Sequence, residues 1–347
     1  MVDTTLLLTI AIIAAALIFD FINGFHDAAN SIATVVASRV LRPLIAVLWA
    51  AAFNFLALFI FDTGVAKTVG SGMIDLRLIT PMVIFAGLLG AIGWNLITWW
   101  WKIPSSSSHA LVGGYAGAAL AHAVVTLGLA KAPSIIIASG WGKTLLFVGA
   151  APLIGMGLSS LLMMVVIWLF HKVSAPIADP LFRKLQLLSS AFLSLNHGAN
   201  DAQKTAGVIA GALFAGGYTD HFIIPAWVLG CAYTTMALGT AIGGWRIVQT
   251  MGARLTRIRP HSGFCAETAA ACSIMLATLF KLPVSTTQTT TGAIIGVGFL
   301  QRVKSVRWGI AVNILAAWII TIPAAGGLAA LAMLAFHALG LANFGIK

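Results

Sequence analysis

The sequence that decides the fold is NGFHDAAN, at residues 23–30. A related sequence, HGANDAQK, occupies residues 197–204. Aligned on Asp27 and Asp201, the two share the pattern Gly-x-x-Asp-Ala, and both lie in apolar surroundings. We call them the aspartate segments. Because two such similar polar sequences lie far apart in one apolar chain, they indicate an internal duplication.

A second pair of polar sequences follows the aspartate segments in the same order. KIPSSSSH occupies residues 102–109 and KLPVSTTQ occupies residues 281–288, and we call them the proline segments. Both contain the pattern Lys-x-Pro-x-Ser, followed by two more hydroxyl residues. The spacing from the aspartate to the proline is 77 residues in the first half and 82 in the second. Order and spacing are both repeated, which predicts two equivalent halves.

The composition around these segments is typical of a membrane protein. Of the 347 residues, 60% are hydrophobic and 8% are charged, and the mean hydropathy is +0.99. So few charges cannot cover a soluble globular domain, whereas the apolar runs can cross a bilayer many times. We predict an all-α polytopic membrane protein with about 10–12 transmembrane segments and broken or half helices at a central site. The long apolar runs cover residues 5–22, 43–62, 81–101, 110–127, 145–170, 222–245, 264–281 and 306–336.

The net charge of +11 has two interpretations. A basic protein can bind nucleic acid, but here the basic residues are divided among short connections, which favours a topology signal. With both termini outside, thirteen lysines and arginines face the cytoplasm against six outside. We therefore predict a multi-pass plasma-membrane protein that contacts the lipid bilayer and no nucleic acid. The thirteen are Arg39, Arg42, Lys102, Lys172, Arg183, Lys184, Arg246, Arg254, Arg257, Arg259, Arg302, Lys304 and Arg307.

An odd number of predicted crossings separates equivalent elements, so the second half enters the membrane upside down. We predict a first inverted repeat at residues 1–170, a short basic cytoplasmic connection at 171–186 and a second inverted repeat at 187–347. In transporters built this way, substrate and ion sites lie near the bilayer midplane where the repeats meet. The three cysteines lack metal-ligand spacing, and we expect no cofactor.

The two aspartates are costly at the predicted membrane depth. An unpaired carboxylate there costs at least ~2.5–3.5 kcal/mol on insertion scales, so each must be protonated, paired or bound to a cation. One interpretation is a structural carboxylate that caps a broken helix or bridges two helices. The other is a site for a coupling Na+ or proton, which the nearby neutral amide oxygens favour. Those amides belong to Asn23, Asn30, Asn196 and Asn200.

The proline segments predict the starts of two helices. Proline fits a first turn, and the serines or threonines that follow cap the free amides. Such a helix start presents unpaired N–H groups, hydroxyl donors and the positive end of the helix dipole, which together bind a phosphate-like anion. The alternative is ordinary capping and packing between membrane helices. The duplication favours the anion site.

Four further residues are candidates for the site. His26, beside Asp27, either relays protons or is a hydrogen-bonded packing residue. His109 corresponds to Gln288 in the second half, and both are candidates for lining the site. Glu267 has no counterpart in the first half, and a lipid-facing carboxylate is costly, so we predict that it lines the site or a gate.

The motifs NGFHDAANSIATV, PSSSSHALVG, LNHGANDAQK and PVSTTQTTTG follow one another in this order. With them, the sequence resembles the inorganic phosphate transporter (PiT) family of secondary carriers over essentially its whole length. The resemblance implies cotransport of inorganic phosphate with Na+ or H+. It implies a coupling-cation site, with Na+ at the aspartates as one alternative, made of Asp27, Asn30, Asn200 and Asp201. It implies phosphate ligands at Ser106, Ser107, Ser108, Ser285, Thr286 and Thr287.

Two departures from the family pattern have consequences. Members often carry Asn just before the first motif aspartate, whereas this chain has His26 at that position. In this it resembles the proton-coupled bacterial carriers, and that resemblance implies uptake of a neutral metal-phosphate complex. The chain also lacks the long hydrophilic central loop of many relatives, so regulation through such a loop is not expected. The resemblance leaves open a homodimer and a separate PhoU-like cytoplasmic regulator.

Two other functions fit parts of the pattern. A carrier of another tetrahedral oxyanion, such as sulfate, could use the same helix starts. An intramembrane hydrolase could use a serine with His109, but the serine run lacks a strand–turn–helix context, and catalysis gives no reason for duplication. We therefore predict secondary active symport of phosphate by alternating access, and no enzyme activity.

Overall fold

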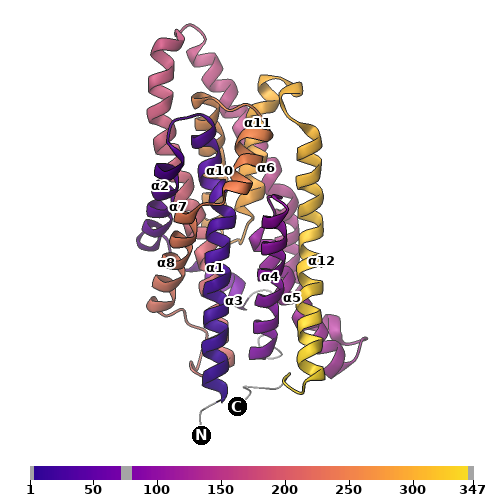
Figure 1. The fold of residues 1–347 in the computed structure, drawn as a ribbon. Helices are drawn as coiled ribbons and strands as arrows, with labels where there is room; N and C mark the ends of the chain where they lie inside the picture. The colour runs from indigo at the N-terminus through magenta and orange to yellow at the C-terminus, as the bar shows by residue number, and fades with distance from the viewer. Residues whose placement is uncertain (1–3, 72–79, 343–347) are drawn as a thin grey trace.

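The computed structural model describes residues 4–71 and 80–342, and every regular element within these ranges is a helix (Figure 1). The prediction of an all-α fold is therefore confirmed for these residues. A π-helical turn, η4 (Gln249–Arg254), follows α9. The α-helices are α1 (Thr4–Ala37), α2 (Pro43–Leu56), α3 (Gly64–Ser71), α4 (Pro81–Trp100), α5 (Ser107–Leu127), α6 (Ala138–Phe170), α7 (Ala175–Ala215), α8 (Ala226–Ile242), α9 (Trp245–Val248), α10 (Pro260–Leu279), α11 (Thr286–Gln301) and α12 (Trp308–Ala338).

By length and composition, six of the described helices can each cross a membrane, namely α1, α4, α5, α6, α10 and α12. Two bent pairs raise the number to eight if each pair is one span. One pair is Pro43–Phe59, which includes α2, with Gly64–Gly70 of α3, bent by 87°. The other is α8 with Trp245–Arg254, which comprises α9 and η4, bent by 61°. This is fewer than the 10–12 segments expected from the sequence, because α7 carries the polar second aspartate segment and α11 has only 16 residues.

Helix α1 begins and helix α12 ends at the same end of the bundle (Figure 1). The opposite end brings together the end of α1, the start of α10 and the connection between α11 and α12. Arg39, Arg257 and Arg307 lie at that end. This end of the bundle therefore carries basic residues that the positive-inside rule places on the cytoplasmic side.

Two helical hairpins enter the bundle from opposite ends (Figure 1). The first hairpin consists of α4 and α5, and the second consists of α10 and α11. Their tips, formed by the proline segments, meet inside the bundle. The Ser108 hydroxyl donates to the Val284 carbonyl at 3.4 Å, and His109 Nδ1 lies 3.4 Å from Gln288 Nε2.

Each hairpin tip begins with a lysine in the left-handed backbone conformation. The φ angle is 62° at Lys102 and 60° at Lys281. The next amide then bonds to the carbonyl five residues back, at 3.0 Å from Ile103 and at 2.9 Å from Leu282. This Schellman closure satisfies carbonyls at the helix end and reverses the chain. The two tips are therefore built by the same local device.

The prediction that the prolines start helices is wrong. Helix α5 begins at Ser107 and α11 at Thr286, three residues after Pro104 and Pro283 respectively. The prolines lie in the irregular linker that follows each Schellman turn. The hydroxyl residues of the proline segments, and not the prolines, therefore form the helix starts.

Each hairpin is covered by a long helix from the other half. Helix α12 packs along α4 and α5, whereas α6 packs along α10 and α11. Both covering helices contain an internal proline, Pro152 in α6 and Pro323 in α12. Likewise, α1 packs beside α8 and α7 packs beside α2. The halves are interlocked, and the turn between them covers only residues 171–174 because α7 begins at Ala175.

The aspartate segments lie in the middle of two uninterrupted helices, α1 and α7. The aspartate segments contain no proline. Their glycines allow other helices to pack closely and do not break the helix. A Cβ on Gly24 would collide with the Met236 carbonyl of α8, and a Cβ on Gly198 would collide with the Asn54 carbonyl of α2. The helix breaks beside the aspartates therefore come from the proline segments.

Candidate functional site

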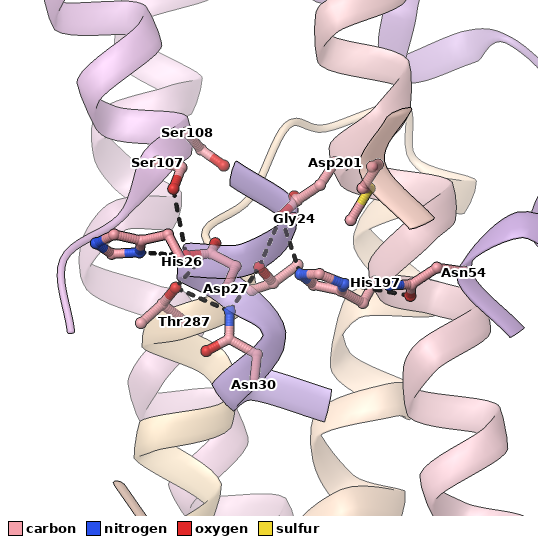
Figure 2. A network of polar contacts seen from close by, with 12 residues as sticks. Gly24, His26, Asp27, Asn30, Asn54, Ser107, Ser108, His197, Asp201 and Thr287 are labelled. Atoms are coloured by element: carbon pink, nitrogen blue, oxygen red, sulfur yellow. Dashed lines mark hydrogen bonds and ion pairs between the residues drawn. The ribbon is translucent and has the colours of Figure 1, made fainter. Parts of the chain in front are cut away.

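The carboxylate of Asp27 lies where the two hairpin tips meet (Figure 2). It is 2% exposed, and it accepts hydrogen bonds from Ser107 Oγ and from Thr287 Oγ1, each at 3.2 Å. His26 Nδ1 lies 2.8 Å from Asp27 Oδ1. Asn30, one turn along α1, donates to Thr287 Oγ1 at 2.9 Å. Each hairpin therefore contributes one hydroxyl to the same carboxylate.

The carboxylate of Asp201 has a cationic partner on its own helix. Lys204 Nζ lies 2.6 Å from Asp201 Oδ1, one turn along α7. Thr286 Oγ1 donates to Asp201 Oδ2 at 3.1 Å, and His197 Nε2 lies 3.3 Å from the same oxygen. Asp201 is therefore paired with a basic side chain inside the bundle.

The two aspartates converge on one small region. Possible ligand atoms of Asp27, His197 and Asp201 all lie within 4.8 Å of one another, and the three side chains are buried. Among the described residues, no other group of three or more His, Cys, Asp or Glu side chains is arranged in this way. Thr286 and Thr287 link the aspartates, since they donate to Asp201 and Asp27 respectively. The start of α11 thus bridges the two aspartate segments.

Lys204 brings a fixed positive charge to the hairpin tips. Its Nζ lies 2.5 Å from Ser108 Oγ and 2.7 Å from the Val284 carbonyl, in addition to its contact with Asp201. The side chain is buried. A buried ammonium beside hydroxyl donors is suited to binding an anion.

Four asparagine side chains in or directly beside the aspartate segments are buried, and the side-chain oxygen of each has no hydrogen-bond partner. A buried acceptor without a partner is costly unless a ligand satisfies it. Carboxylate and amide oxygens are the ligands that hard cations accept. The residues present therefore fit a bound cation near Asp27 and Asp201. The four are Asn23, Asn30, Asn196 and Asn200.

The starts of α5 and α11 carry the predicted anion ligands. Ser106 and Ser285 are the N-caps, and their Oγ atoms accept from the amides of His109 and Gln288, both at 3.2 Å. The first two amides of each helix precede its first internal hydrogen bond, so they are free to face a ligand. These amides belong to Ser107, Ser108, Thr286 and Thr287. All six predicted phosphate ligands thus lie at two facing helix starts.

The predicted histidine and glutamine positions connect the hairpins to the site. His26 faces Asp27 through Nδ1, and its Nε2 lies 3.2 Å from Thr98 Oγ1 on α4. It therefore links the first hairpin to the carboxylate. His109 and Gln288 contact each other and join the two tips.

Glu267 lies outside this cluster. It is buried on α10 and accepts hydrogen bonds from Gln186 Nε2 at 2.9 Å and from Ser189 Oγ at 2.5 Å. Both donors precede the aspartate segment on α7, and at 1.5 Å per residue Ser189 is about 18 Å along the helix from Asp201. The structure therefore brings Glu267 to α7 but not to the hairpin tips.

Three polar residues of the cluster were not selected from the sequence. His197 and Lys204 lie four residues before and three residues after Asp201, a spacing that puts all three on one helix face. That spacing was an available signal. Asn54 on α2 contacts His197 Nδ1 at 3.3 Å, and only the packing of α2 against α7 brings it there.

The fold and the site together define a multi-pass membrane protein with a buried polar site between two opposed hairpins. The chain belongs to the phosphate transporter family, whose family model matches residues 23–329. The resemblance identified in the sequence is therefore confirmed. The family and the names of its relatives denote transporters and not enzymes.

Two bacterial relatives match nearly the whole chain. A protein of Rhizobium meliloti (strain 1021) named "Probable low-affinity inorganic phosphate transporter" is 52% identical over 329 residues, covering 93% of this chain and 95% of the relative. A protein of Bacillus subtilis (strain 168) with the same name is 43% identical, covering 95% of this chain and 97% of the relative.

A solved structure described as "The sodium-dependent phosphate transporter" has the same fold. It superposes with a TM-score of 0.84 at 23% sequence identity, covering 96% of this chain and 99% of that one. At this identity, the likeness concerns the arrangement of the helices.

Proposed function

We propose that this protein is a secondary active transporter that carries inorganic phosphate together with Na+ or H+ by alternating access. The observation that carries the proposal is the meeting of Asp27 and Asp201 with the hydroxyl-rich starts of α5 and α11. Family membership and the names of the relatives support phosphate as the substrate.

The proposed phosphate site lies between the two helix starts. Ser106, Ser107 and Ser108 on one side and Ser285, Thr286 and Thr287 on the other offer hydroxyl and amide donors. The positive ends of two helix dipoles add to this field. Lys204 Nζ, already beside Ser108 Oγ, would supply a charge-assisted hydrogen bond to a phosphate oxygen.

Charge explains the proposed coupling. Lys204 compensates Asp201, whereas Asp27 has only His26 and neutral hydroxyl groups as direct partners among the described residues. A bare carboxylate repels an approaching phosphate strongly where the dielectric constant is low. A cation or proton at Asp27 removes this repulsion. Phosphate would therefore bind after the coupling ion.

Two observations bear on the coupling ion. The unpartnered oxygens of Asn30 and Asn200 support Na+, which needs several oxygen ligands, as does the sodium dependence named for the structural relative. The contact between His26 and Asp27 supports a proton and a neutral metal-phosphate substrate. Both proposals use the same carboxylate, so the ion must be determined by transport measurements.

We further propose that residues 1–170 and 187–347 are inverted repeats, with residues 171–186 as their connection. The opposed hairpins, the matching Schellman turns at Lys102 and Lys281 and the exchanged covering helices support this division. Each hairpin tip also accepts a hydrogen bond from a threonine in the other half of the chain. The Lys102 carbonyl accepts from Thr250 at 3.1 Å, and the Lys281 carbonyl accepts from Thr68 at 2.8 Å.

The decisive experiment is uptake of radiolabelled phosphate into proteoliposomes with Na+ and pH gradients imposed separately. Accumulation driven by one gradient and abolished when it is dissipated would identify the coupling ion. Equal, non-accumulating flux under all conditions would contradict symport and indicate a passive channel. Competition by sulfate as strong as by unlabelled phosphate would instead favour a general oxyanion carrier.

A further inference from the structure

A second basic site lies at the end of the molecule that the sequence analysis assigns to the cytoplasm. It is a pocket of about 570 Å³, which we call the arginine pocket. Its walls come from the end of α1, the stretch from η4 to the start of α10, and the connection between α11 and α12. No residue of the aspartate or proline segments lines it. The arginines that line it are Arg39, Arg257, Arg259 and Arg307.

The charge of the arginine pocket is uncompensated within the described chain. No acidic residue lines it, and none of the ion pairs among the described residues involves its four arginines. Asp179 lines a neighbouring pocket that shares Arg259 and also contains His261. Four guanidinium groups without carboxylate partners leave a strong positive field that a polyanion would neutralise.

A helix start in the pocket wall is also suited to an anion. The 20-residue helix α10 begins at Pro260 in the pocket wall, so its positive dipole end faces the same space as the four arginines. The positive end of a helix dipole stabilises an anion, so it adds to the attraction of the guanidinium groups.

The size of the pocket favours a ligand larger than a single phosphate. Its volume is within the range of about 300–1,000 Å³ typical of small-molecule sites, and it is many times the roughly 30 Å³ that a water molecule occupies in the liquid. Arginine binds phosphate oxygens in pairs, so four arginines can hold more than one phosphate group.

We propose that the arginine pocket binds an anion that carries at least two phosphate groups, either a soluble oligophosphate or a lipid headgroup with two phosphates. Because its walls join the ends of α1, α10 and α12, an occupant ties the second hairpin to elements outside it. Occupancy would then slow transport from the cytoplasmic side. This regulatory role rests on the proposed function, whereas binding itself does not.

Binding is tested by calorimetry on the detergent-solubilised full-length protein, with tripolyphosphate as the probe. The Arg257→Ala/Arg307→Ala variant should bind at least about tenfold more weakly, because it loses two charge-assisted contacts. The matched control is Arg302→Ala/Lys304→Ala, which removes two nearby basic residues outside the pocket and should bind like the unmodified protein. Equal affinity in all three proteins, or no saturable binding, would overturn the proposal.

Two further variants separate this site from folding defects and from the central site. Arg257→Lys/Arg307→Lys keeps every charge and should weaken tripolyphosphate binding by a few-fold, since lysine lacks the paired contacts that arginine makes to phosphate oxygens. Thr287→Ala, altered at the hairpin tips, should leave tripolyphosphate binding unchanged. Binding that is lost in Thr287→Ala and fully kept in Arg257→Lys/Arg307→Lys would assign the probe to the central site and contradict the proposal.

Nanodiscs distinguish the two sources of the ligand. If cardiolipin-containing nanodiscs abolish tripolyphosphate binding and neutral ones preserve it, the natural occupant is the lipid headgroup. If both preserve it, the occupant is soluble. In proteoliposomes, tripolyphosphate on the pocket side should slow phosphate uptake several-fold in the unmodified protein but not in the double arginine variant. Unchanged uptake despite intact binding would refute only the regulatory role.

Discussion

The two aspartate segments differ in charge although their backbones are arranged alike. Asp27 and Asp201 both lie in uninterrupted helices, and each accepts a hydrogen bond from a threonine hydroxyl at the start of α11. Asp201, however, is paired with the ammonium of Lys204, whereas the ionisable partner of Asp27 is the imidazole of His26. The two halves of the site therefore pair their carboxylates with different side chains, an imidazole in the first half and an ammonium in the second.

Substitution of Asp201, whose carboxylate is paired with Lys204, should have the largest effect on stability and transport. Asp201→Asn leaves Lys204 as a buried, unpaired charge, which costs about 3–5 kcal/mol, so we expect both unfolding and loss of transport. The Asp201→Asn/Lys204→Met variant removes both charges and should recover most of the stability but no uptake. Thermal unfolding in detergent measures the first effect. A stable Asp201→Asn single variant would contradict the assigned pair.

Substitution of Asp27, the carboxylate beside His26, should give a different phenotype. Asp27→Asn leaves no unpaired lysine, so we expect a folded protein whose phosphate uptake in proteoliposomes falls to the level of protein-free vesicles. Its unfolding temperature should stay closer to that of the unmodified protein than that of Asp201→Asn. Full gradient-driven uptake by this variant would refute the coupling role of Asp27.

The threonines at the start of α11 allow a milder test of the phosphate site. Thr287→Ala removes one donor near the charged ligand and should raise the apparent KM for phosphate by about tenfold, the effect of losing one hydrogen bond to a charged group. Thr287→Ser keeps the hydroxyl and should restore the original value. An unchanged KM in Thr287→Ala would exclude this residue as a ligand.

The smallest effects should come from the hairpin turns, where the halves are most alike. Lys102→Gly and Lys281→Gly each relieve a left-handed backbone conformation and should stabilise the protein by about 0.5–1 kcal/mol. Because both turns have the same geometry, the two gains should be equal within error. A clear difference between them in unfolding experiments would show that the turns are not energetically equivalent.

The sequence was sufficient to predict the helical membrane class, the family and the residues at the hairpin tips. These features depend on local patterns, namely apolar runs and repeated polar motifs. The Schellman turns were missed because the lysines in left-handed conformation carry no glycine signal. The contribution of Lys204 was missed because its reach to Ser108 and Val284 depends on how the second hairpin packs beside α7.

Glu267 is a second residue whose contacts could not be predicted from local sequence patterns. A carboxylate in an apolar helix predicted a residue that lines the site or a gate, whereas the partners that Glu267 has in the structure depend on contacts between distant segments. Gln186 and Ser189 carry no motif, and they reach Glu267 because α10 lies against α7. Sequence periodicity does not encode such pairings between helices.

The exchange of covering helices has a consequence for biosynthesis. The first hairpin packs along α12, and α12 leaves the ribosome after the other helices of the described chain. The first hairpin must therefore remain in the translocation machinery or the lipid, with the face that α12 covers still exposed, until α12 has been made. The second hairpin, in contrast, finds α6 already inserted. Premature termination before α12 should thus leave a nascent chain whose N-terminal half is the exposed part, and quality-control proteases would recognise that half first.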